Sequence, residues 1–181
     1  MEHSVSTLKT NTIQAATGSN VTIASGNVLQ APGHVLQVLQ STTTDTTTIA
    51  SGATASAVLS QAITPSSTSN KILINISVNI GGVNNSYGHG QLKRGSTLIG
   101  AGAAADSRPQ ASFGLMSGLS SNFDYRMAIH NFMFLDSPST TSATTYSVDL
   151  ICTSGGMNFN RSNNDGDSSI AHRGMSTITV I

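Results

Sequence analysis

Charged residues are scarce in this sequence. Eight basic and eight acidic residues make up 9% of the 181 positions and cancel to a net charge of zero, whereas roughly 25% of the residues of an ordinary soluble domain are charged. A chain without excess positive charge has no electrostatic reason to bind nucleic acid or an anionic membrane, so we expect neither partner. Little charge also does little to keep single copies apart, which favours a protein that works within an assembly.

Cysteine is almost absent and tryptophan is wholly absent. The one cysteine, Cys152, excludes an intrachain disulfide. It follows an apolar stretch, so we expect a buried, inert thiol. A chain without disulfides is typical of a protein made in a reducing cytoplasm. No run reaches the roughly 18 apolar residues of a membrane span, and residues 1–4 do not resemble the start of a signal peptide. We therefore expect no membrane insertion.

Serine, threonine and glycine are abundant instead. Serine and threonine number 50 together, and there are 17 glycines, so hydroxyl groups must supply much of the polar surface. Disorder is the competing interpretation of such a composition. Disordered chains combine low hydrophobicity with high net charge, whereas here 38% of residues are hydrophobic and the net charge is zero. We therefore expect a folded chain.

Three short segments follow one another near the start, at residues 11–18, 19–26 and 27–33, and each ends on glycine. A unit this short holds one strand and one turn, and it must stack on other units or other chains to bury its apolar side. We predict that residues 1–33 form an anchoring arm that trimerises, and that residues 34–181 form the main domain. An extended arm with accidental similarity is the alternative. The expected axial residues are Ile13, Val21, Ile23, Val28 and Leu29.

Short strands dominate the main domain. The alternation of aliphatic and mostly polar residues is clearest at residues 71–80. Five aliphatic residues at period two predict a strand with one buried face and one mostly solvent-exposed face. Residues 41–48, rich in threonine, are expected to be an edge strand or loop, and residues 100–118 show no helical stripe. Many short strands favour an all-β, antiparallel β-sandwich or jelly roll. The other expected strands are 34–40, 57–63, 89–94, 97–99, 125–135, 144–152, 157–160 and 174–181.

Catalytic and metal-binding patterns are missing. The acidic residues are scattered, and no spacing marks a pair for acid–base catalysis. The five histidines form neither an HxH nor an HExxH pattern. We expect His89, between two glycines, in a surface loop or at a strand start, and His130 on the wetter face of its strand. The chain is therefore predicted not to be an enzyme, and to have no cofactor and no metal.

Two asparagine-rich stretches are candidate contact loops. Asparagine, serine and aspartate side chains in an exposed loop can hydrogen-bond sugar hydroxyls. The second stretch could also ligate calcium, but it lacks the spacing and the final glutamate of an EF-hand loop, and such turns often form without metal. The candidate contact residues are Asn84, Asn85, Asn160, Asn163, Asn164, Asp165 and Asp167.

Six pieces of the sequence, in this order, carry a resemblance that runs almost end to end: residues 8–14, 31–38, 63–74, 92–97 with 99–100, 134–138 and 173–180. Through them the chain resembles small, tail-fibre-like virion proteins of marine and cyanobacterial tailed phages. The resemblance implies a bacteriophage virion structural protein, assembled in the host cytoplasm, with a homotrimeric arm and a β-domain. Such an appendage would bind other virion proteins and present loops to a host-surface glycan. The alternative is a capsid decoration, or cement, protein or a head fibre. The resemblance brings no catalytic motif.

Overall fold

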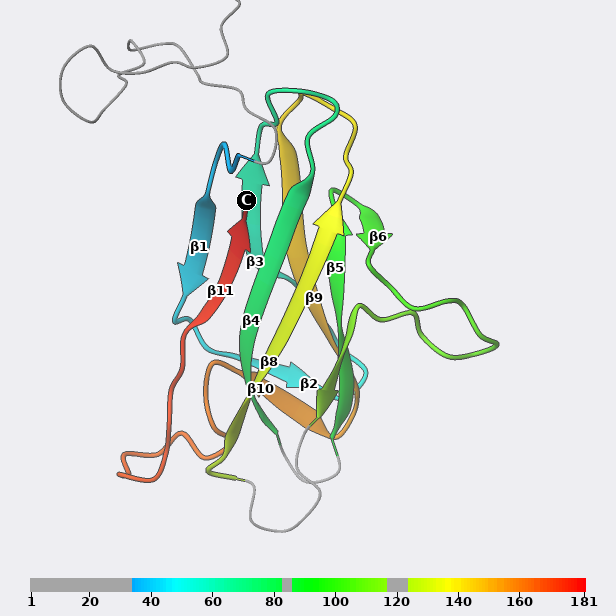
Figure 1. Cartoon of the computed structure of the whole chain (residues 1–181). Helices are drawn as coiled ribbons and strands as arrows, with labels where there is room; N and C mark the ends of the chain where they lie inside the picture. The colour runs from blue at the N-terminus through cyan, green and yellow to red at the C-terminus, as the bar shows by residue number, and fades with distance from the viewer. Residues whose placement is uncertain (1–33, 83–85, 117–123) are drawn as a thin grey trace, which may run out of the picture. The chain divides into compact units, whose positions relative to one another are not determined.

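The computed structural model describes residues 34–82, 86–116 and 124–181, which form eleven β-strands and no helix (Figure 1). All the strands pair antiparallel, in two sheets. Sheet A has the order β1 (Leu39–Thr43), β11 (Ser176–Val180), β4 (Ile72–Gly82), β10 (Gly156–Phe159) and β2 (Thr47–Ala50), with β8 (Met127–Asp136) on the other edge of β4. Sheet B has the order β3 (Thr54–Ile63), β9 (Thr144–Ser154), β5 (Tyr87–Arg94) and β6 (Thr97–Ile99), with β7 (Phe113–Met116) also paired with β5.

The strands pair in the nested order of a jelly roll. β1 pairs with β11, β3 with β9, β4 with β8, and β5 with both β6 and β7, so each pair lies inside the preceding one along the chain. These four sets of pairs alternate between sheets A and B, as in a long hairpin that has rolled up, while β2 and β10 add a further pair to sheet A. The prediction of an all-β sandwich or jelly roll is confirmed. The trimerising arm of that prediction lies outside the described residues.

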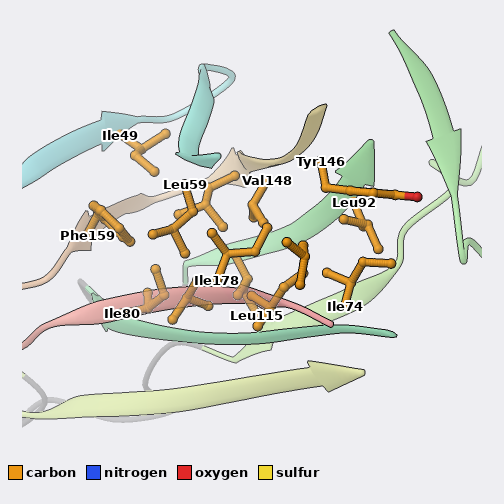
Figure 2. Close-up of a cluster of buried hydrophobic side chains, with 14 of the residues drawn as sticks. Ile49, Leu59, Ile74, Ile80, Leu92, Leu115, Tyr146, Val148, Phe159 and Ile178 are labelled. Atoms are coloured by element: carbon orange, nitrogen blue, oxygen red, sulfur yellow. The ribbon is translucent and has the colours of Figure 1, made fainter. Parts of the chain in front are cut away.

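The core lies between the sheets, and β4 contributes more to it than any other strand (Figure 2). Its inward positions alternate with period two, as predicted, and each is at most 3% exposed. Burying one such aliphatic side chain stabilises the fold by about 1.5–3 kcal/mol. Cys152 of β9 is buried in the same core, as predicted, and burial raises the pKa of its thiol. The inward residues of β4 are Ile72, Ile74, Ile76, Val78 and Ile80.

The first strands begin and end at other residues than predicted. The strand expected at residues 34–40 starts only at Leu39, and it continues into the threonine-rich segment as far as Thr43. After a short loop, the rest of that segment enters β2. β1 and β2 are the two outermost strands along the path of sheet A, so the prediction of an edge strand is confirmed. Threonine suits an edge because its hydroxyl remains solvated while its branched Cβ favours extended backbone.

The structure of β5 (Tyr87–Arg94) differs from the prediction at His89. The prediction for His89 is wrong, because His89 lies within β5 and is only 8% exposed. The two glycines beside it serve packing rather than exposure. A Cβ at Gly88 would lie 2.6 Å from the sulfur of Met157, and a Cβ at Gly90 would lie 2.1 Å from the ring of Phe113. Phe113 belongs to β7, a strand that the sequence analysis did not predict.

β8 faces the opposite way to the prediction. His130 pairs with the buried Val78, so His130 lies on the inner side of β8 together with Phe132 and Phe134. The outer side instead presents Ile129 and two further apolar residues of β8 to solvent. The expectation that His130 occupies the wetter face is therefore wrong.

The sandwich forms a compact unit of its own, Gln37–Ile181. Among the described residues, no helix is long and apolar enough to cross a membrane.

Candidate functional site

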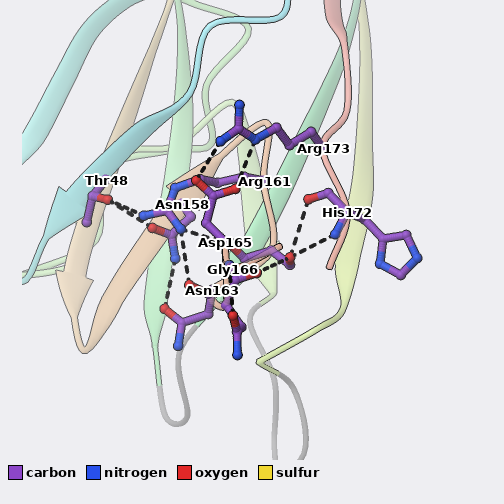
Figure 3. A network of polar contacts seen from close by, with 10 residues as sticks. Thr48, Asn158, Arg161, Asn163, Asp165, Gly166, His172 and Arg173 are labelled. Carbon is purple, nitrogen blue, oxygen red and sulfur yellow. Dashed lines mark hydrogen bonds and ion pairs between the residues drawn. The ribbon is translucent and has the colours of Figure 1, made fainter. Parts of the chain in front are cut away.

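The second candidate contact stretch lies in the loop that connects β10 to β11. This loop, residues 160–175, is held by the polar network of Figure 3 and also contacts Asp124 and Tyr125 ahead of β8; we call the loop and these two residues together the loop cluster. Loops carried on a rigid β-scaffold are where binding residues usually lie. The described contact candidates of the sequence analysis all fall in this cluster.

Asn160 is a structural residue rather than a contact residue, because it is fully buried. Its Nδ2 donates to the carbonyl oxygens of Thr43 at 2.9 Å and of Asp45 at 3.1 Å, and its Oδ1 accepts a hydrogen bond from Ser176 Oγ at 2.5 Å. Its φ of 58° lies in the left-handed region, which asparagine tolerates better than most residues. Asn160 thus fixes the path of the chain where β10 ends, and its assignment as a contact residue is corrected.

Asn163 and Asn164 are half-buried, and their amides tie the loop cluster together. Asn163 accepts a hydrogen bond from Asn158 Nδ2 at 3.1 Å and donates to Asp124 Oδ1 at 2.9 Å. Asn164 donates to the hydroxyl of Tyr125 at 2.9 Å, and its Oδ1 accepts from the backbone of residue 166 at 3.0 Å. These bonds occupy groups that a ligand would otherwise use, so the two residues shape the loop more than they present it.

Two arginines brace the loop cluster from either side. Arg161 donates to Thr48 Oγ1 at 2.7 Å and to the carbonyl oxygens of residues 162 and 163 at 3.0 and 3.1 Å. Arg173 forms a bidentate ion pair with Asp165, in which Nε donates to Oδ1 at 2.9 Å and Nη2 donates to Oδ2 at 2.8 Å. The hydrogen bonds from Arg173 hold the pKa of Asp165 below its ordinary value. Asp165 is therefore a carboxylate over the whole neutral range.

The exposed side of the loop cluster forms a surface pocket with a polar lining. Asp167 is exposed and makes no hydrogen bond to another described residue, while Asp165 and Arg173 lie beside it as an exposed ion pair. Carboxylates accept hydrogen bonds from hydroxyl groups and a guanidinium donates them, so this lining suits a ligand rich in hydroxyls. The pocket is lined by Asp165, Gly166, Asp167, Ser168, Ala171 and Arg173.

The site differs in membership from the sequence prediction. Asp165 and Asp167 are brought together at the surface, whereas Asn84 and Asn85 lie outside the described residues, as do Ile13, Val21, Ile23, Val28 and Leu29. The sequence analysis did not include Arg173 or Ser168. A signal for both was present, since polar residues continue from residue 160 through to residue 169 and Arg173 precedes β11. In the described part of the chain, no three histidine, cysteine or acidic residues gather as metal ligands would.

Comparison with known proteins gives remote similarity in fold. No protein-family model matches the chain, and no curated protein matches it. Among solved structures, that of the infectious bursal disease virus Gx strain is similar at a TM-score of 0.41 and 12% identity, over 85% of this chain and 40% of that one. The VP2 subviral particle of infectious bursal disease virus is similar at a TM-score of 0.42 and 12% identity, over 85% of this chain and 41% of that one. The chain thus spans about two fifths of the length of both.

Proposed function

We propose that this chain is a bacteriophage virion structural protein, a trimeric tail-fibre-like appendage that presents the loop cluster to a glycan on the host surface. The observation that carries the proposal is the pairing of a fixed loop with an exposed polar pocket. Asn160, Asn163 and Asn164 hold the loop from within, and the exposed Asp165, paired with Arg173, and the exposed Asp167 line the pocket.

A preorganised loop suits sugar binding, because little conformational entropy is lost in ordering the residues that contact the ligand. Sugar hydroxyls both donate and accept hydrogen bonds, and the pocket offers acceptors on Asp167 and donors on Arg173. The scarcity of charge elsewhere on the chain supports a role inside an assembly. On a rigid β-scaffold, loops are where binding residues usually lie.

The experiment is a binding assay of the labelled full-length chain on host cells and on their isolated surface polysaccharide. The test variant carries Asp165→Asn and Asp167→Asn, which remove both carboxylate charges from the pocket. The control is Asp106→Asn, in an exposed turn outside the loop cluster. Asparagine tolerates the positive φ of 49° at residue 106.

We expect the double variant to bind at least about tenfold more weakly, which corresponds to about 1.4 kcal/mol. Its melting temperature should stay close to that of the native chain, because the Asp165–Arg173 pair is exposed and contributes little to stability. Binding by the double variant as tight as that of the Asp106→Asn control would contradict the proposal.

A further inference from the structure

Within the bounds of four neighbouring strands, the outer face of sheet A carries no charged side chain; the exposed Lys71 directly precedes β4 and donates a hydrogen bond to Ser137 Oγ at 2.6 Å. β1, β11, β4 and β8 lie side by side in that order, with β4 in green and β8 in yellow in Figure 1. Their outward positions hold only amides, hydroxyls and aliphatic or thioether groups. The outward residues are Gln40 and Thr42 of β1, Thr177 and Thr179 of β11, Leu73, Asn75, Ser77 and Asn79 of β4, and Met127, Ile129, Asn131, Met133 and Leu135 of β8.

One row across this face is wholly apolar. Leu135 pairs with Leu73, and Leu73 exchanges two backbone hydrogen bonds with Ile181, each of 2.9 Å. Val38 directly precedes β1, at the outer end of the same row, since the next residue pairs with Val180. Val38 is 60% exposed and Leu135 is 58% exposed, so the row is open to solvent in a single chain.

Two further apolar side chains are exposed along β8, with Met133 next to Leu135 and Ile129 beyond the outward Asn131. Met133 is 65% exposed and Ile129 is 63% exposed, both on the outer side of the strand. Scattered exposed aliphatic residues are common on proteins, but a contiguous apolar patch rimmed by uncharged polar groups marks an interaction surface. We call this surface, the outer face of β1, β11, β4 and β8, the neutral face.

We propose that the neutral face is an interface with a second copy of this chain. A surface without charge meets an identical surface without like-charge repulsion, whereas a charged partner would lose the solvation of its own charges there. In a trimer, the neutral faces of the three copies would lie around the threefold axis and meet one another there. Copies of one chain related by symmetry are the commonest partners of such self-compatible surfaces.

The area of the neutral face is compatible with an interface between copies of this chain. Four strands about 4.8 Å apart span about 19 Å across the sheet. An average strand of the four has seven or eight residues and is about 25 Å long at about 3.4 Å per residue, so the flat area of the face is about 500 Å². Side chains roughen this area towards the ~800 Å² that each partner buries in a standard stable interface. The inference does not depend on glycan binding, because the loop cluster contributes no residue to it.

The test measures how accessible single cysteines are in the full-length chain. Leu135→Cys and Met133→Cys place a thiol on the neutral face, and Ser60→Cys places one at an exposed position of β3 in sheet B. Native Cys152 is fully buried and gives a low background. Maleimide labelling rates are measured alongside the mass by light scattering, at micromolar concentration and after dilution, with thermal melts to verify folding.

We expect an oligomer in which the thiols at residues 133 and 135 react about tenfold or more slower than that at residue 60, and in which dilution to monomer removes the difference. An oligomer with equal rates at all three positions would overturn the proposal. A monomer would overturn it as well. If the thiol at residue 135 were still slow in that monomer, another segment of the same chain would cover the face.

Discussion

Arg94 of β5, in sheet B, forms an ion pair with Asp136 of β8, in sheet A, and so links the two sheets. Its Nη1 lies 3.0 Å from Asp136 Oδ1 and 2.9 Å from Oδ2, and the hydroxyl of Tyr146 of β9 donates to the same carboxylate at 2.7 Å. The Asp136 side chain is only 9% exposed. A buried carboxylate held by a cation and a hydroxyl is satisfied, so the contact links the sheets at the end of β8 where the aliphatic core stops.

The first prediction concerns this link. Asp136→Asn removes the charge that balances Arg94, and it should lower the free energy of unfolding by about 1–3 kcal/mol. The lower part of that range applies because the Arg94 side chain is 32% exposed and remains partly solvated. Tyr146→Phe removes only the hydroxyl and should cost about 1 kcal/mol. Urea denaturation of the three proteins checks this, and a cost for Asp136→Asn below that of Tyr146→Phe would disprove the account.

The second prediction concerns a bulge in β3. The pairing of β3 with β9 slips between Ala55 and Leu59, and Ala57 has a φ of 50°. The backbone N–H of Ala57 donates to Asp149 Oδ1 at 2.8 Å, and Lys93 Nζ lies 2.5 Å from the other oxygen of Asp149. Ala57→Gly should stabilise the chain by about 0.5–1 kcal/mol, because glycine adopts positive φ without strain.

The control for the bulge is Ala62→Gly, at a regularly paired position of β3. This change should destabilise the chain by about 0.5–1 kcal/mol, since glycine loses more conformational entropy in a strand. Thermal melts of both variants give the comparison. A melting temperature for Ala57→Gly that falls as far as that for Ala62→Gly would show that the positive φ stores no strain.

The third prediction tests the close approach of β5 to β7. Gly90→Ala would place a Cβ 2.1 Å from the Phe113 ring, so the ring must shift. The change should cost about 1–3 kcal/mol through overpacking. Gly114→Ala, where no atom lies within 4 Å of the added Cβ, is the matched control in β7. Equal melting temperatures for the two variants would mean that Phe113 does not pack on Gly90.

The fourth prediction is a pH dependence that arises from His89. Burial lowers the pKa of His89 below its ordinary value of 6.5, so the unfolded chain binds a proton more readily than the folded chain. The stability that His89 contributes is complete above about pH 6.5 and is lost as the pH falls below that value. Between about pH 7.5 and about pH 5.5, His89→Gln should lose less stability than the native chain. Stability is measured by urea denaturation at both pH values. Equal losses of stability in His89→Gln and in the native chain would show that other groups cause the pH dependence.

The sequence predicted the strands whose two faces differ. β4 alternates isoleucine and valine with polar residues, so both its existence and its inward face could be predicted. β8 carries apolar residues on both faces, with Phe132 and Phe134 inside and Met133 and Leu135 outside. Its periodicity therefore could not assign His130 to a face.

Nonlocal contacts limited the rest of the prediction. β7 has four residues, one of them Gly114, and it becomes a strand because it pairs with Tyr87–Gly90 far earlier in the chain. Asn160 belongs to a polar stretch that looks exposed in sequence, yet Thr43 and Ser176 surround it. No local pattern encodes such partners, because tertiary pairing overrides local propensity. The sequence therefore predicted which stretch forms a polar loop, but not which of its residues are buried.

The most direct test of the central claim is cryo-electron microscopy of intact virions of the phage that we propose carries this chain. The account predicts trimers of the chain at the tail, with the loop cluster at residues 160–175 facing outward and the neutral face buried between copies. Absence of the chain from purified particles would contradict a virion role. Copies arrayed over the shell, with the loop cluster against the capsid, would contradict attachment and make the chain a decoration protein.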